Sequence, residues 1–166
     1  EIDFVFRPHP LLFNNLLEKH IWTREQIDTY IVRIKESPNC RYDDSGDYLQ
    51  LFADSDAMIH DCGSYIGEYL FTEKPCCYML KADKQVRKVL LPMGEACMAH
   101  YYKAFCEADI CNFIENVVLK GNDPLKEKRQ QFSRTHLKFN YPHGAQTIIS
   151  LLEETICTDG ENGGTI

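Results

Sequence analysis

A short run of small and polar residues separates an apolar segment from a helical pattern near position 60. Residues 57–60 are mostly apolar, Asp61-Cys62-Gly63-Ser64 follows, and the helical pattern starts at Tyr65. A glycine lets the backbone approach a ligand closely, and a serine adds a hydroxyl group. The first N–H groups of a helix have no partner inside the helix and attract anions. The spacing therefore predicts a phosphate-binding turn, and a tight turn capped by Ser64 is the structural alternative.

The position of this turn in the expected fold supports the same chemistry. Ligands of open α/β sheets bind beyond the carboxyl ends of the strands, which is where the turn would lie. Glu68 follows Ser64 by four residues, so both side chains share one helix face. The candidate anion-binding residues are Asp61, Cys62, Gly63, Ser64 and Tyr65.

A second candidate lies where the first predicted strand ends. Residues 2–7 are mostly apolar, and Pro8-His9-Pro10 ends the strand because proline cannot donate to a ladder. A histidine at such a strand end can hold or move a proton near neutral pH. Arg7 can pair with a phosphate. The structural alternatives are a His9 hydrogen-bonded within a rigid turn and an Arg7 with only a surface role.

The order of strand and helix patterns predicts an α/β fold. Apolar runs at 2–7, 57–60 and 76–80 alternate with helical patterns, which is typical of a parallel sheet with helices on both faces. We expect four or five strands in this sheet, including these three runs. The prediction is a single Rossmann-like domain over residues 1–157.

Helical spacing dominates the remainder of the chain. Thr23 and Gln26 form a capping-box pattern before an apolar stripe that contains Ile27. The carboxy-terminal region is predicted to be mostly helical, with helical spacing over residues 98–105, 110–118, 125–136 and 145–156. Residues 158–166 are small, polar and rich in glycine, and we expect a disordered tail there.

Composition and charge exclude several classes of protein. The chain has 166 residues, 44% hydrophobic and 26% charged, which is ordinary for a soluble globular domain. Its net charge of −7 disfavours non-specific binding of nucleic acid. No apolar run approaches the roughly 20 residues that span a bilayer, and no signal-peptide pattern is present. Because the chain begins at Glu1 and enters a strand at once, we expect an upstream part to be missing.

The eight cysteines are predicted to be reduced structural thiols. Disulfide frameworks belong to secreted proteins, and Cys76 and Cys77 lie in a predicted buried strand where cysteine acts as a small hydrophobe. The spacing along a helix also prevents a four-ligand zinc site at Cys97, His100, Cys106 and Cys111. No metal and no cofactor are expected.

Three landmarks occur in a fixed order along the chain. Residues 4–10 form a strand that ends in a basic residue and His-Pro, and His143-Gly144-Ala145-Gln146 precedes a closing helix. Between them, residues 53–80 contain the strand, turn and helix described above, followed by Lys-Pro. Together these landmarks resemble the bacterial CDP-glycerol glycerophosphotransferases, the teichoic acid polymerases. The residues in register with the central motif of that family are Asp56, Asp61, Ser64, Glu68, Lys74 and Pro75.

The resemblance implies the carboxy-terminal, donor-binding half of a GT-B architecture. It implies a transferase that uses a nucleotide-diphosphate donor, CDP-glycerol or a sugar nucleotide, in the synthesis of cell-surface polymers such as teichoic acid. It further implies an amino-terminal acceptor domain as partner, and a cytoplasmic location with peripheral attachment to the inner face of the plasma membrane. In these terms His9 is the catalytic residue and Glu68 contacts the nucleoside. The donor pyrophosphate binds to Arg7, Asp61, Cys62, Gly63, Ser64 and Tyr65.

Two other functions remain open at this point. One is a GT-B glycosyltransferase or a sugar-nucleotide epimerase in surface polysaccharide synthesis. The other is a degenerate, non-catalytic interaction domain with a Rossmann-like fold, because His60, Cys62 and Gly63 replace the Thr, Tyr and Ser of the family motif. In that family the catalytic base lies in the amino-terminal half, so we expect this chain to be inactive alone.

Overall fold

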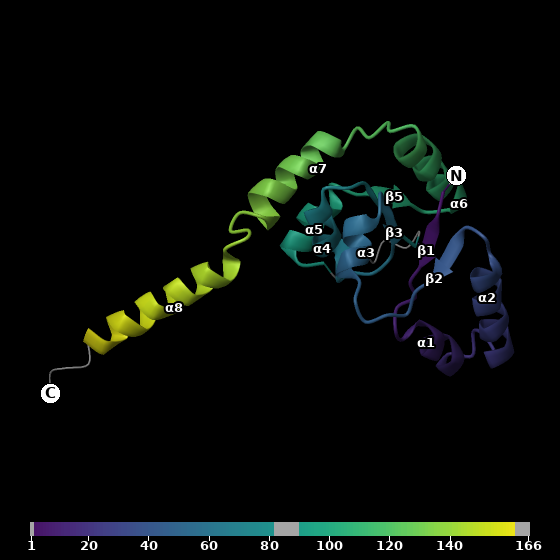
Figure 1. Ribbon diagram of the computed structural model, residues 1–166, viewed down its shortest axis with the longest axis horizontal. Helices are drawn as coiled ribbons and strands as arrows, with labels where there is room; N and C mark the ends of the chain where they lie inside the picture. Colours follow the sequence, from purple (N-terminus) through teal and green to yellow (C-terminus); the bar gives the residue numbers. More distant parts are fainter. Residues whose placement is uncertain (1, 82–89, 162–166) are drawn as a thin grey trace. The chain divides into compact units, whose positions relative to one another are not determined.

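The computed structural model describes residues 2–81 and 90–161. These residues form two compact units, residues 1–54 and residues 55–166. The purple-to-blue elements of Figure 1 belong to the first unit, and those from blue through teal to yellow belong to the second. Among the described helices, none combines the length and apolar character needed to cross a membrane.

The first unit contains a two-stranded parallel sheet. Strands β1 (Phe4–Phe6) and β2 (Cys40–Tyr42) pair so that Phe4 lies opposite Cys40 and Phe6 lies opposite Tyr42. Parallel neighbours require a crossover connection, which the intervening helices provide. The helices of this unit are α1 (Leu12–Glu18), α2 (Arg24–Glu36) and α3 (Leu49–Asp54).

The capping box predicted for α2 is confirmed. The Thr23 hydroxyl accepts a hydrogen bond from the Gln26 N–H at 3.2 Å, and the Gln26 side-chain oxygen accepts one from the Thr23 N–H at 2.8 Å. Ile27 on the predicted stripe is buried. The ring of Tyr30, on the same helix, lies 5.7 Å from that of Phe6 and 5.2 Å from that of Trp22, measured between centroids. An aromatic cluster therefore joins α2 to the first strand.

The second unit contains a three-stranded parallel sheet in the order β3-β4-β5. The central strand, β4 (Cys76–Met79), has β3 (Met58–His60) on one side and β5 (Tyr102–Ala104) on the other. Its helices are α4 (Tyr65–Glu68), a 3₁₀ turn (Tyr69–Thr72), α5 (Pro92–Met98), α6 (Glu107–Asn112), a π-helical segment (Phe113–Leu119), α7 (Lys126–Phe132), a second π-helical segment (Ser133–Leu137) and α8 (Gly144–Glu161).

The core of this unit forms around the central strand. Cys76, Cys77 and Tyr78 are consecutive buried residues, as expected of a parallel strand covered on both faces. Cys77 packs with Ala104 of β5 and with residues of the first π-helical segment, among them Phe113. The prediction that these cysteines lie in a buried strand is confirmed.

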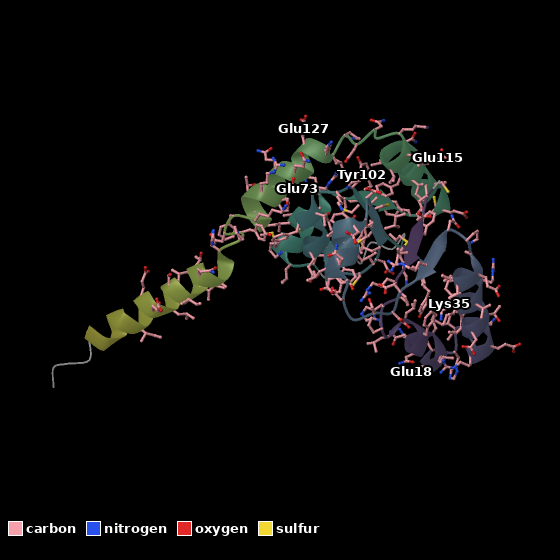
Figure 2. All side chains as sticks on the ribbon, in the orientation of Figure 1. Glu18, Lys35, Glu73, Tyr102, Glu115 and Glu127 are labelled. Carbon is pink, nitrogen blue, oxygen red and sulfur yellow. The ribbon has the colours of Figure 1, made fainter. Side chains whose placement is uncertain are left out.

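The buried Arg129 on α7 is linked through Asp123 to Tyr102 on strand β5. The Arg129 side chain is 0% exposed, and its guanidinium pairs with the carboxylate of Asp123, which also accepts a hydrogen bond from the Tyr102 hydroxyl at 2.7 Å. Burial by itself would raise the pKa of Asp123, but the hydrogen bonds from Arg129 and Tyr102 lower it below its ordinary value. Arg129 Nε also donates to the Glu73 carbonyl oxygen at 3.1 Å. Figure 2 labels Glu73, whose carbonyl oxygen binds Arg129, and Tyr102, whose hydroxyl binds Asp123.

The α/β fold with parallel strands and flanking helices is confirmed, but the single sheet is not. β1 pairs with β2, whereas β3 and β4 belong to a separate sheet. The mostly apolar composition of residues 2–7 is typical of a buried parallel strand, but Phe4 and Val5 are 40% and 37% exposed. Apolar residues in a short run indicate a strand but do not identify its partner.

Two predictions for the carboxy-terminal region also need correction. The helical spacing over residues 98–105 misled, because residues 102–104 form strand β5. Three residues at helical spacing in so short a segment fit a strand beside a helix end equally well. The last helix continues through residues 158–161, where a tail was expected. Residues 162–166 lie outside the described part of the chain.

Candidate functional site

The turn of residues 61–64 follows the carboxyl end of β3 and leads into α4. Asp61, Gly63 and Ser64 are exposed, and Cys62 is half-buried. No heavy atom lies within 4 Å of the position that a Cβ atom would take at Gly63. A side chain at Gly63 would therefore enter open space, and the fold of the turn does not itself require glycine there.

Three buried side chains make hydrogen bonds to backbone carbonyl oxygens of residues 61–66. The Tyr78 hydroxyl donates to the carbonyl oxygen of Asp61 at 2.9 Å, and His60 Nδ1 lies 3.1 Å from that of Cys62. The Tyr101 hydroxyl donates to the carbonyl oxygen of Ile66 at 2.8 Å. The three rings also pack together: the His60 ring lies 5.1 Å from the Tyr78 ring and 5.4 Å from the Tyr101 ring, between centroids.

These hydrogen bonds determine where the N–H groups of the turn point. Among the described residues, the one cis peptide bond is Tyr141–Pro142, so the bonds within the turn are trans. In a trans peptide the N–H is directed opposite to the C=O of the same peptide group. The carbonyls of Asp61 and Cys62 face buried donors, and the N–H groups of Cys62 and Gly63 are therefore directed away from them. No described residue accepts a hydrogen bond from either N–H.

The electrostatic state of His60 follows from its burial. The residue is 6% exposed, and burial lowers the pKa of its imidazole to about 4, against the opposing effects of the Cys62 hydrogen bond and the Asp61 charge. The ring is thus neutral at physiological pH. A carbonyl oxygen can only accept, so Nδ1 carries the proton and Nε2 is left as an acceptor. His60 Nε2 is buried without a hydrogen-bond partner.

Ser64, Tyr65 and Glu68, the other predicted site residues of this segment, lie in the turn and in α4. The Ser64 hydroxyl lies 3.1 Å from the Cys62 sulfur, and Ser64 stands at the N-cap position of α4 without a side-chain capping hydrogen bond. The Tyr65 ring is half-buried, with its centroid 6.4 Å from that of His60. Glu68 is exposed on α4.

Arg7 belongs to the first unit and has partners there. Its guanidinium forms an ion pair with Asp43, donates to the carbonyl oxygen of Ser45, and lies 5.6 Å from the centroid of the Tyr48 ring. Burial would raise the pKa of Asp43, but hydrogen bonds from Ser45 and Arg7 lower it below its ordinary value. A phosphate at Arg7 would therefore compete with a carboxylate that is already bound.

His9 lies in an exposed turn of the same unit. Its Nδ1 accepts a hydrogen bond from the Leu11 N–H at 3.1 Å, and its carbonyl oxygen accepts one from the Leu12 N–H at 2.8 Å. In the neutral ring the proton is then on Nε2. These bonds match the structural alternative of a histidine that holds its own turn, and they leave the proposed catalytic role untested.

The predicted site residues thus form two groups. Arg7 and His9 lie in the first unit, and residues 61–68 lie in the second. The single sheet predicted above would have placed both groups beside strands of one sheet, but β1 pairs with β2 and β3 pairs with β4. Beyond β4 at the carboxyl edge the chain continues through Leu80 to the exposed Lys81, which sequence reasoning missed.

Part of the family motif lies at the opposite end of the strands. Lys74 Nζ donates to the carbonyl oxygen of Ser55, and the N–H of Met58 donates to the carbonyl oxygen of Pro75 at 3.2 Å. These residues precede β3 and β4, so they join the amino ends of the two strands. Lys74 is half-buried there and is not at the carboxyl edge, where the turn lies.

Sequence reasoning also missed the buried side chains that support the turn. His60 is the last residue of an apolar strand, and Tyr78 is the third residue of another. A buried histidine or tyrosine needs a hydrogen-bond partner for its polar atom. That requirement could have indicated that both residues bind backbone groups close to the strand ends.

The cysteines and metal ligands of the described residues form no further site. Cys40, Cys62, Cys76, Cys77, Cys97, Cys106 and Cys111 are free thiols. Within residues 2–81 and 90–161, no three His, Cys, Asp or Glu side chains are grouped so as to hold a metal ion. Comparison with protein-family models, with curated proteins and with solved structures found no match for this chain.

Proposed function

We propose that the second unit binds the pyrophosphate of a nucleotide-diphosphate donor at the turn of residues 61–64, and that it is the donor-binding part of a transferase. One observation carries this proposal. The carbonyl groups of Asp61 and Cys62 are bound by buried side chains, which directs the N–H groups of Cys62 and Gly63 away from the core. Successive backbone N–H groups with a common direction bind anions.

The surroundings of the turn decide how strong such binding can be. The space beside Gly63 is open, the Ser64 hydroxyl can donate, and Lys81 follows the adjacent strand. The exposed carboxylates of Asp61 and Glu68 act against an anion. Attraction must therefore come from the backbone N–H groups, Ser64 and Lys81, and we expect binding that weakens markedly with added salt.

The resemblance described above supports CDP-glycerol as the donor and glycerophosphate as the transferred group. In this proposal Glu68 contacts the nucleoside, and the roles that the resemblance implies for His9 and Arg7, which lie in the first unit, form no part of it. A glycosyltransferase or epimerase that uses a sugar nucleotide is the alternative within the same class. The base preference of the site separates them, because the two kinds of donor carry different nucleosides.

Binding of nucleotides to the intact chain tests the proposal. Calorimetric titration with CDP, UDP, ADP and inorganic pyrophosphate should detect binding of at least one of them. Gly63→Val adds a side chain where the ligand approaches and should abolish binding while leaving the melting temperature unchanged, because the added atoms enter open space. Gly46→Val is the matched control, since a side chain there also enters open space, in the first unit.

The outcomes separate the proposals clearly. Binding that survives Gly63→Val and is equally strong in the control would place the phosphate elsewhere. Absence of binding by the parent protein to all four ligands would contradict the donor-binding function. A preference for CDP over UDP and ADP would favour CDP-glycerol.

A non-catalytic interaction domain is the second candidate, and helix α8 favours it. Its apolar side chains recur at helical spacing along one side of the helix, and each is more than half exposed: Ile148, Ile149, Leu151, Leu152 and Ile156. Such an apolar stripe is typical of a surface that contacts another protein. This function predicts no binding of nucleotides, so the same titrations decide between the two.

A further inference from the structure

The turn of residues 61–64 depends on side chains that no ligand would touch. Tyr78 is 7% exposed and His60 is 6% exposed, and both come from strands of the sheet below the turn. Each donates one hydrogen bond to one carbonyl oxygen, Tyr78 to Asp61 and His60 to Cys62. Each therefore fixes one peptide group, and the N–H of that peptide group belongs to the next residue along the chain.

We propose that His60 and Tyr78 are positioning residues, which hold the N–H groups of Gly63 and Cys62 in the direction that binds the anion. This inference rests on the proposed function of the turn. Without the two donors, the carbonyl groups of Asp61 and Cys62 lose the hydrogen bonds that orient the peptide groups 61–62 and 62–63. A rotated peptide group would present its carbonyl oxygen to the anion in place of its N–H, and would repel it.

The unusual environment of His60 supports this role. Its Nε2 is a buried acceptor without a partner, which is a rare arrangement in folded proteins. An apolar side chain would avoid that cost, but it would also lose the Nδ1 donor. We interpret the unpaired Nε2 as the cost of placing the Nδ1 donor of His60 beside the Cys62 carbonyl oxygen.

Tyr101 offers an internal control for the inference. Its hydroxyl also donates to a backbone carbonyl, that of Ile66, and its ring also packs against His60. The N–H of the corresponding peptide group belongs to Gly67, inside α4, and not to the turn. Tyr101→Phe removes the same atom as Tyr78→Phe from the same buried cluster, but it leaves both N–H groups of the proposed site in place.

The experiment is a titration of the full chain, labelled with ¹⁵N, with inorganic pyrophosphate. The amide signals of Cys62 and Gly63 report the site directly, and the spread of all other signals shows that each variant is folded. We expect Tyr78→Phe to weaken binding about tenfold, as the loss of one ordering hydrogen bond would. We expect Tyr101→Phe to remain within about twofold of the parent protein, because its effect does not reach the turn.

A second pair of variants tests the donor of His60 by itself. His60→Leu removes the donor and should weaken binding about tenfold. His60→Asn places an amide N–H close to the position of Nδ1 and should restore binding to near that of the parent, although it restores neither the ring nor its packing. A purely structural role for His60 would make both variants equally weak.

The inference and the proposed function fail in different ways. A parent protein whose Cys62 and Gly63 signals do not respond to pyrophosphate contradicts the proposed function and removes the basis of the inference. A parent protein that responds, with Tyr78→Phe responding equally or Tyr101→Phe weakened as much as Tyr78→Phe, overturns the positioning role alone. Equal loss in His60→Leu and His60→Asn overturns the role of His60.

Discussion

Each of the two units has a turn between a parallel strand and a helix, but the polar groups of the two turns have different partners. In each unit a turn of small or polar residues follows a parallel strand and leads into a helix. In the first unit the polar atoms of the turn satisfy one another, since Arg7 binds Asp43 and His9 binds the Leu11 N–H. In the second unit, buried side chains bind the carbonyl groups of the turn and leave two N–H groups without an acceptor among the described residues.

This difference separates two turns that look equally functional in the sequence. A polar side chain that already has a partner inside the protein must break that interaction to bind a ligand. A backbone N–H without an acceptor in the protein has no such interaction to break. The two units also differ in how deeply their Arg–Asp ion pairs are buried. The Arg7 and Asp43 side chains are 17% and 14% exposed, while those of Arg129 and Asp123 are 1% and 10% exposed.

The largest expected effect comes from breaking these two ion pairs in parallel. Arg129→Met leaves the Asp123 carboxylate buried without its cation, and should lower the free energy of unfolding by about 3–5 kcal/mol. Arg7→Met breaks a partly buried pair and should cost less, about 1.5–3 kcal/mol, as the loss of hydrogen bonds to a charged group does. Urea unfolding followed by circular dichroism measures the first variant. Fluorescence of Trp22, the one tryptophan of the chain, measures the second because it lies in the first unit.

Equal losses in both variants would contradict the contrast between a fully buried arginine and a partly buried one. Arg129→Lys is the control that keeps the charge and removes the planar group. It should recover part of the loss, because one ammonium cannot replace the bonds that the guanidinium makes to both Asp123 and the Glu73 carbonyl.

The next effect concerns pH and the buried imidazole of the second unit. The pKa of His60 is lowered from 6.5 to about 4, so between these values the unfolded chain binds a proton that the folded chain does not. Stability from this residue is fully present above pH 6.5, falls as the pH decreases, and by pH 4 has dropped by about 3 kcal/mol. Urea unfolding by circular dichroism between pH 7 and pH 4 measures this loss.

A variant isolates the contribution of His60 from that of other groups. Burial also lowers the pKa of His100, which acts in the same direction. The difference between the parent protein and His60→Asn, taken at each pH, removes the effect of His100. The same pH dependence in both proteins would show that His60 is not the residue responsible.

Features of the fold and of the candidate turn that depend on neighbouring residues could be predicted from the sequence. Features that depend on residues far apart in the sequence could not. The capping box of Thr23 and the strands within residues 2–7, 57–60 and 76–80 follow from neighbouring residues and were predicted correctly, whereas strand β5 was not. The division into two sheets depends on which strands pair over long distances, and apolar runs alone do not encode that choice. The position of the candidate turn was predicted, but its support from Tyr78 and Tyr101 depends on strand register and on a loop far along the chain.

The smallest expected effect uses two serines, one in each unit, to separate folding from binding. Ser45 accepts a hydrogen bond from Arg7 at 3.3 Å and donates one to the Asp47 carbonyl oxygen at 3.0 Å, whereas Ser64 is exposed and caps nothing. Ser45→Ala should lower the stability reported by Trp22 by about 0.5–1.5 kcal/mol and leave nucleotide binding unchanged. Ser64→Ala removes only a contact with the Cys62 sulfur, so it should change stability little. It should weaken binding of whichever of CDP, UDP and ADP the protein binds by about 0.5–1.5 kcal/mol, because the anion loses one hydroxyl donor. Urea unfolding and calorimetry on both variants measure the four values. A Ser64→Ala protein that loses stability but binds as before would assign this turn to the fold, as in the first unit, and would remove the contrast between them.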